Sequence, residues 1–177
     1  MNTNSNSYTI IYASVMVVIV AFLLAFVSSS LRETQNKNVQ LDTKKQILAA
    51  LNIKNVEDAD AEYQKYVFHV YGAGLWGAIW GYIALNEDKD TVYGTYFSHA
   101  SETPGLGAEI ATEHFQNEFV GKKTLEDGSI ALGVVKNGKV EKPEYQVDGI
   151  SGGTITSVGV DAMLKACLSS YMSFLTK

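Results

Sequence analysis

The stretch DGISGGTITSVGVDAMLKACLSSYMSFL, at residues 148–175, decides how this chain folds. Its second part repeats apolar residues at spacings of three and four, the period of one face of an α-helix. This stripe contains Val160, Met163, Leu164, Cys167, Leu168, Tyr171 and Leu175. The spacing predicts an amphipathic helix after Ser157 that packs on the rest of a domain. Cys167, the only cysteine, is expected to be a small buried residue of that helix.

The first part of the same stretch, residues 148–157, contains three glycines and four hydroxyl side chains directly before the helix. Such a loop can turn several backbone N–H groups towards one anion, and the positive end of the following helix adds to the attraction. A Walker loop is excluded because no Gly-Lys-Ser/Thr follows, and the glycine spacing does not fit a dinucleotide fingerprint. Spacing alone leaves two interpretations open, a phosphate-binding loop and an ordinary turn with a Ser or Thr cap.

Upstream of this loop, stretches rich in Val, Ile, Tyr, Phe and Trp predict β-strands. They lie near residues 67–71, 78–85, 91–98 and 130–135. A polar turn at 86–90 separates two of them, and Asn137 followed by Gly138 is a strong signal for a hairpin after the last. Strands joined by such short turns predict an antiparallel sheet.

A second amphipathic helix is predicted to begin at Thr103 and Pro104, with Thr103 as N-cap and Pro104 in the first turn. The helix should end near Gly121, and its apolar stripe contains Leu106, Ile110, Ala111, Phe115 and Phe119. The fold class is therefore α+β, with an antiparallel sheet packed against helices.

The N-terminal segment has the composition of a membrane anchor. Residues 8–27 form an apolar run of 20 residues, which a helix would extend over about 30 Å, the thickness of a bilayer core. A cleaved signal peptide has a shorter apolar region after a basic stretch, whereas all 14 basic and 19 acidic residues lie at or after Arg32. We therefore predict an uncleaved transmembrane anchor at 1–30, a stalk helix and connector at 31–66, and one globular domain at 67–177.

The net charge and the small number of possible metal ligands argue against two classes of function. A net charge of −5 without a basic cluster argues against nucleic-acid binding. One cysteine and three scattered histidines argue against a structural zinc site, so no metal ligand is assigned.

The glycine-rich loop also carries a resemblance. DGISGGTIT, at 148–156, resembles the motif Asp-Gly-x-Ser/Thr-Gly-Ala-Thr of the FMN-binding domains in the C subunit of the sodium-translocating NADH:quinone oxidoreductase and in the G subunit of the Rnf complex. In that family the last threonine of the motif is esterified to the phosphate of FMN, which implies covalent attachment at Thr154. The resemblance places four further residues at the cofactor: Asp148, Ser151, Gly152 and Gly153, the last replacing the usual alanine.

A second stretch, ETPGLG at 102–107, resembles the segment that borders the flavin ring in this family. It implies five more cofactor-binding residues: Glu102, Thr103, Gly105, Leu106 and Gly107. The two glycines are expected to let a planar ligand approach the backbone. Trp76 is a candidate to flank the ring, and Lys136 to place a cation near the reduced flavin or its phosphate; packing and a solvated turn are their alternative roles.

The resemblance implies an electron-transfer subunit of a membrane-bound, sodium-pumping NADH:quinone oxidoreductase, with covalent FMN as its cofactor and no catalytic side chain. The implied partners are the other subunits and a flavin transferase that attaches FMN. Direct hydride transfer from NADH is not expected because no second nucleotide motif is present, and the uncharged anchor does not suggest an ion pathway. An Rnf-type subunit with the same FMN and a membrane-anchored, non-redox binding module are the alternatives.

Two signals disagree about which side of the membrane holds the domain. Arg32, Lys37, Lys44 and Lys45 follow the apolar run, and the positive-inside rule would place them in the cytoplasm. The resemblance implies a single-pass protein of the bacterial inner membrane with a periplasmic domain, and we adopt that expectation. The lead-in before residue 67 is shorter than is usual in the family.

Overall fold

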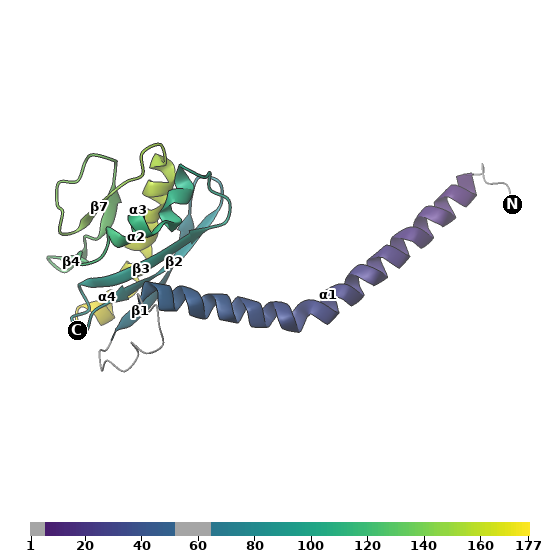
Figure 1. The fold of residues 1–177 in the computed structure, drawn as a ribbon, viewed down its shortest axis with the longest axis horizontal. Helices are drawn as coiled ribbons and strands as arrows, with labels where there is room; N and C mark the ends of the chain where they lie inside the picture. Colours follow the sequence, from purple (N-terminus) through teal and green to yellow (C-terminus); the bar gives the residue numbers. More distant parts are fainter. Residues whose placement is uncertain (1–5, 52–64) are drawn as a thin grey trace. The chain divides into compact units, whose positions relative to one another are not determined.

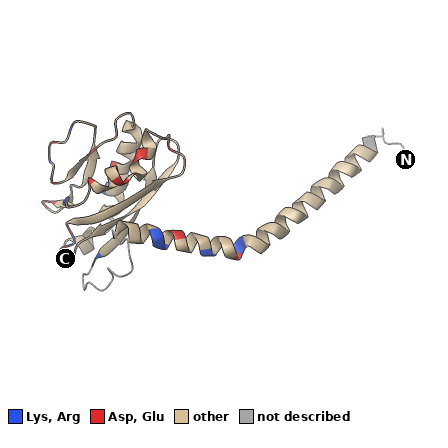
Figure 2. Cartoon of the chain, viewed as in Figure 1, with Lys and Arg blue, Asp and Glu red and all other residues tan. Residues whose placement is uncertain are grey.

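The computed structural model describes residues 6–51 and 65–177, and its first element is a long helix. Helix α1 (Asn6–Ala50) has 45 residues and contains a candidate membrane span that begins at Tyr8. Figure 2 shows that the charged residues of α1 are confined to its second half, as the sequence requires. The chain divides after Thr43 into a helical unit and a compact unit, Lys44–Lys177. Of the predicted stalk helix and connector at 31–66, residues 52–64 lie outside the described residues.

A three-stranded antiparallel sheet forms the centre of the compact unit (Figure 1). Its strands, in the order β1-β2-β3, are β1 (Tyr66–Ala73), β2 (Ala78–Leu85) and β3 (Val92–His99). Helix α3 (Thr154–Ser169) packs on one face of the sheet and buries Val160 and Leu164 there. At Gly72 an added Cβ would lie 2.8 Å from the Cβ of Met163, so the helix rests directly on β1. The predicted antiparallel sheet with helices against it is confirmed.

The last predicted hairpin is wrong. Strands β4 (Leu125–Glu126) and β5 (Ser129–Ile130) pair antiparallel, but β6 (Gly133–Val135) pairs in parallel with β7 (Gln146–Asp148). Asn137 and Gly138 do form a turn, with Gly138 at φ +73°, but no strand begins directly after it, and the next strand is β7. The reason is burial, because Val147 of β7 is 1 % exposed whereas Val140, which the hairpin would have used, is 38 % exposed.

The helix predicted at 103–121 is divided into two short helices. These are the 3-10 helix η2 (Gly107–Ala111) and α2 (Glu113–Asn117). Thr112 separates them because its backbone is extended, and its hydroxyl accepts the Phe115 N–H at 3.4 Å as the cap of α2. The predicted core residues Ile110, Phe115 and Phe119 are nevertheless buried, and the Phe115 and Phe119 rings make an edge contact at 5.4 Å.

The C-terminal helix also differs from its predicted bounds. It begins at Thr154, three residues before Ser157, and ends at Ser169, after which α4 (Met172–Leu175) follows. Cys167 is half-buried, and its Sγ accepts the Tyr71 N–H at 3.4 Å. The residue therefore joins α3 to β1, as a packing role requires.

Candidate functional site

The glycine-rich loop is a turn held by its own helix. The Gly153 N–H donates to the Ile150 oxygen at 3.0 Å, and Gly152 between them adopts φ +77°, which favours glycine. Ser157 holds this turn from the helix side, since its Oγ accepts the Ile150 N–H at 3.0 Å and donates to the Gly153 oxygen at 2.9 Å. We call residues 148–153 the glycine turn. Sequence reasoning treated Ser157 only as the residue before the helix and missed this role.

A second attachment fixes the start of the glycine turn. Asp148 Oδ1 accepts the Gly138 N–H at 2.7 Å, and Asn137 Nδ2 donates to the Gly149 oxygen at 2.8 Å. Asp148 therefore binds a neighbouring turn of the protein, and Asn137 is a structural partner that sequence reasoning assigned only to a hairpin. Lys136, the cation predicted near the cofactor, begins that neighbouring turn and is exposed.

Thr154 lies at the end of the glycine turn as the first residue of α3. It is exposed, and Gly153 at the N-cap offers no side chain to the helix. The first intrahelical bond runs from the Ser157 N–H to the Gly153 oxygen at 2.9 Å, so the N–H groups of residues 154–156 precede the helical ladder. An exposed hydroxyl therefore stands at an uncapped, partially positive helix end.

The two sequence motifs meet inside the protein. The Thr156 hydroxyl donates to Glu102 Oε2 at 2.6 Å, across 54 residues of sequence, and the Trp76 N–H donates to Glu102 Oε1 at 2.8 Å. Glu102 is 5 % exposed and Thr156 is 1 % exposed. Burial acts to raise the pKa of Glu102, but hydrogen bonds from Thr156, Trp76 and Gly77, with His99 nearby, together hold that pKa below its usual range.

The two glycines of the ETPGLG stretch are needed for different structural reasons. An added Cβ at Gly107 would overlap the Thr156 hydroxyl and lie 2.5 Å from Glu102 Oε2, so Gly107 is buried against this pair. The expectation that its small size admits a planar ligand is therefore corrected. Gly105 has φ +74° and open space around its Cα, so backbone conformation explains it. Thr103 is exposed, and its carbonyl accepts the Leu106 and Ala108 N–H groups at 3.1 Å, in a turn where the sequence predicted an N-cap.

Exposed apolar side chains lie on the segments that meet around the first turn of α3. Leu106 is 42 % exposed and lies against the glycine turn, because an added Cβ at Gly152 would be 2.7 Å from Leu106 Cδ2. Ile155, next to Thr154, is 59 % exposed, and Trp76 in the β1–β2 turn is 66 % exposed. Solvent-facing apolar groups at one place are typical of a surface that receives a ligand or a partner.

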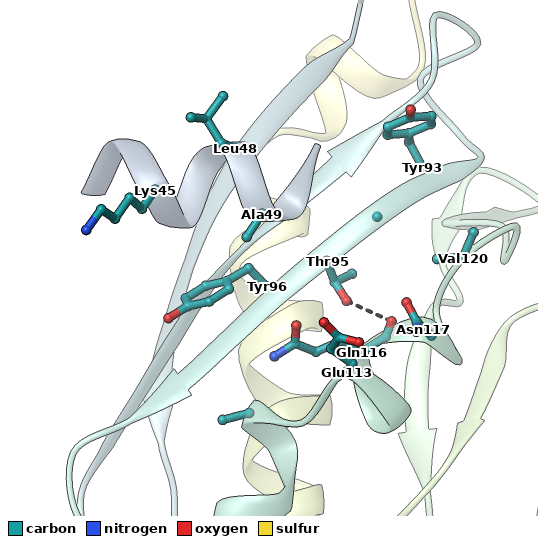
Figure 3. A pocket seen from close by; sticks show the side chains of 12 residues that line it. Lys45, Leu48, Ala49, Tyr93, Thr95, Tyr96, Glu113, Gln116, Asn117 and Val120 are labelled. Atoms are coloured by element: carbon teal, nitrogen blue, oxygen red, sulfur yellow. Dashed lines mark hydrogen bonds between the residues drawn. The ribbon is translucent and has the colours of Figure 1, made fainter. Parts of the chain in front are cut away.

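Two cavities accompany these features. A groove of about 560 Å³ is lined by residues 148–151 of the glycine turn together with Gly105, Glu109, Thr112 and His114. Another cavity of about 560 Å³ lies between the last turns of α1, strand β3 and α2, and contains none of the predicted site residues. Figure 3 shows Lys45 and Ala49 on one side of it, Tyr96 of β3 below them, and Glu113 and Asn117 on the α2 side. The first groove, not the second, belongs to the candidate site.

Comparisons with known proteins agree with the geometry. Residues 74–169 match the FMN-binding domain family. The C subunit of the Na(+)-translocating NADH-quinone reductase of Haemophilus ducreyi is 40 % identical over 111 residues, 62 % of this chain and 43 % of that protein. The corresponding protein of Vibrio alginolyticus is 41 % identical over 106 residues, 59 % of this chain and 41 % of its own length. The chain therefore matches about two fifths of the length of these relatives.

Solved structures extend the comparison to the fold. A crystal structure of the same reductase subunit from Parabacteroides distasonis superposes with a TM-score of 0.74 at 40 % identity, covering 83 % of this chain and 98 % of that one. A crystal structure of Shewanella oneidensis NqrC gives a TM-score of 0.56 at 31 % identity, covering 63 % of this chain and 54 % of that one. The matched family range includes Glu102, the glycine turn and Thr154.

Proposed function

This chain belongs to the FMN-binding domain family and is a homologue of the C subunit of the Na(+)-translocating NADH-quinone reductase, and from that premise we propose that it carries FMN covalently on Thr154 as an electron-transfer subunit of such a complex. FMN supplies reversible redox chemistry when bound, and the protein supplies attachment, orientation and the electrostatic environment. A covalent phosphoester keeps the cofactor in place between turnovers.

The exposure of Thr154 carries the proposal. Of the four hydroxyl side chains in residues 148–157, Thr156 and Ser157 are buried and already hydrogen-bonded, whereas Thr154 and Ser151 are exposed. Of these two exposed residues, Thr154 is the one in the uncapped first turn of α3, where a phosphate would receive backbone N–H groups and the positive helix end. The same observation supports FMN, since a phosphate is the part of that cofactor a helix N-terminus can bind.

The apolar surface next to Thr154 supports a role in binding the ring. Leu106 and Ile155 lie beside the attachment residue, and Trp76 is joined to it through Glu102 and Thr156. We assign these side chains to the flavin ring, which they would shield from water. Asp148 and Gly153 then act by shaping the glycine turn, and Lys136 supplies a cation at its rim.

The partners and the location follow from the same premise. Helix α1 is long and apolar enough to cross a membrane, and the relatives are named as subunits of a reductase, so we propose a single-pass inner-membrane subunit with a periplasmic domain. A flavin transferase would attach FMN, and electrons would pass between other subunits through this domain. An Rnf-type subunit would carry the same cofactor with different partners, which co-purification distinguishes.

Intact mass of the full-length protein, produced with a flavin transferase, tests this function. We expect an added mass of FMN less one water, and a band that fluoresces under ultraviolet light on a denaturing gel. Thr154→Val should abolish both signals, and Ser151→Ala, which alters the other exposed hydroxyl, should retain them. A colourless wild type would favour the non-redox binding module, and retention of FMN by Thr154→Val with loss in Ser151→Ala would show that the wrong hydroxyl was chosen.

A further inference from the structure

Glu102 connects three segments that lie far apart in the sequence. Its two carboxylate oxygens bind the Trp76 N–H at 2.8 Å and the Thr156 hydroxyl at 2.6 Å, so the β1–β2 turn and the first turn of α3 meet at one side chain. The Glu102 N–H donates to His99 Nδ1 at 3.2 Å, which fixes its own backbone at the end of β3. We call Glu102, Thr156 and the Trp76 peptide the carboxylate junction.

The surrounding residues leave room for this carboxylate and for little else. An added Cβ at Gly74 would lie 2.5 Å from Glu102 Oε1, and one at Gly107 would lie 2.5 Å from Oε2. The Trp76 peptide is also held from its other side, because Ser101 Oγ donates to the Trp76 oxygen at 3.0 Å. The two glycines therefore leave space for the buried carboxylate, and the side chains of Ser101 and Thr156 hold the groups around it.

Among the described residues, Glu102 forms no ion pair. Within residues 65–177, which the structure describes, the ion pairs join other residues, and Glu102 is stabilised by N–H and O–H donors. Burying a carboxylate costs free energy, and an apolar residue would pack the same space at lower cost. A carboxylate at this place provides two things that an apolar residue would not, the hydrogen bonds to Trp76 and Thr156 and a negative charge.

We propose that Glu102 is a positioning residue for the flavin, which aligns the attachment turn of α3 with the Trp76 turn and holds a fixed negative charge behind the cofactor surface. This inference rests on the proposed function, because it assumes FMN on Thr154. Through Thr156 the carboxylate sets the direction of the helix turn that carries Thr154, and through the Trp76 N–H it sets the position of an exposed indole. A buried negative charge near the ring opposes the addition of an electron, so it lowers the reduction potential of the flavin.

Potentiometric titration of the flavinylated full-length protein tests the proposal. Glu102→Gln keeps the shape of the side chain but removes its charge, so we expect the midpoint potential to shift to a more positive value. Glu87→Gln is the matched control, because it removes the same charge from an exposed side chain in the turn after β2, at the opposite end of that strand from Trp76. We expect its midpoint potential to shift much less.

Two variants of Thr156 test the hydrogen bond to Glu102 separately from the charge of Glu102. Thr156→Val removes the hydroxyl and should alter the flavin absorption spectrum and slow FMN attachment several-fold, whereas Thr156→Ser keeps a hydroxyl and should restore both. The positioning role would be overturned by an unchanged potential in Glu102→Gln or by equal shifts in Glu102→Gln and Glu87→Gln. Identical behaviour of the two Thr156 variants would overturn it as well. Wild-type protein without covalent FMN would instead overturn the proposed function, and the two failures are therefore distinguishable.

Discussion

Two threonines in the first turn of α3 have opposite environments. Thr154 is exposed at the end of the glycine turn, whereas Thr156 is 1 % exposed and donates to Glu102 in the carboxylate junction. Ser157 and Asp148 hold the glycine turn through hydrogen bonds, and Thr154 at its end is exposed. This region therefore separates the exposed hydroxyl proposed for attachment from the buried groups that hold the turn in place.

The carboxylate junction should respond more strongly to added volume than the exposed turn beside it. Gly107→Ala would push a methyl group into Thr156 and Glu102, and overpacking of this kind should lower the free energy of unfolding by about 3 kcal/mol. Gly105→Ala meets open space and is destabilised only by its positive φ, by about 1 kcal/mol. Chemical denaturation of both full-length variants in detergent measures the two values. Equal losses would mean that Gly107 is not in contact with the junction.

The hydroxyl of each threonine should contribute differently to stability. Thr156→Val leaves a buried carboxylate with one hydrogen bond fewer, which should cost about 2 kcal/mol of unfolding free energy. Thr154→Val changes an exposed side chain and should stay within about 0.5 kcal/mol of the wild type. Thermal unfolding of protein without flavin makes the comparison independent of the cofactor. A larger loss in Thr154→Val than in Thr156→Val would reverse the assignment of the two roles.

The strands of the compact unit show how much of the fold could be predicted from the sequence. Strands β1, β2 and β3 lie within two residues of their predicted bounds, because β-branched and aromatic runs between polar turns carry the signal locally. The Asn137 and Gly138 turn was also found, but its hairpin was not, because a distant strand with a buried Val147 offered better pairing. Local patterns failed where burial of a distant segment stabilised a different pairing.

The candidate site also has one part that the sequence predicted and one part that it did not. The proposal of Thr154 and the glycine turn as the attachment site comes from a contiguous motif, which lies within the residues that match the FMN-binding domain family. The bond from Thr156 to Glu102 spans 54 residues, and no periodicity or spacing predicts such a contact. Gly107 illustrates the consequence, since a glycine in a ligand motif was interpreted as space for the ligand, whereas the space is filled by the protein itself.

A weaker effect is expected in acid, where the dependence of stability on pH tests whether Glu102 is ionised in the folded protein. Burial acts to raise the pKa of Glu102, but its hydrogen bonds outweigh burial and lower that pKa from its ordinary value of 4.5. A carboxylate with a depressed folded-state pKa contributes stability that is present above the unfolded-state value and is lost as the pH falls through the folded-state value. The difference in unfolding free energy between wild type and Glu102→Gln should therefore be constant near neutral pH and shrink below about pH 4.5.

Thr156→Val sharpens this last prediction. The valine removes the side-chain hydrogen bond that lowers the pKa of Glu102, so the folded-state pKa should rise towards or above the unfolded-state value. The contribution of the ionised carboxylate then becomes smaller at neutral pH, and what remains is lost at a higher pH than in the wild type. Denaturation curves of the wild type, Glu102→Gln, Thr156→Val and the double variant between about pH 7 and about pH 3 measure this shift. A wild-type advantage over Glu102→Gln that grows as the pH falls would mean that Glu102 is protonated in the folded protein and that the junction is held by a neutral carboxyl group.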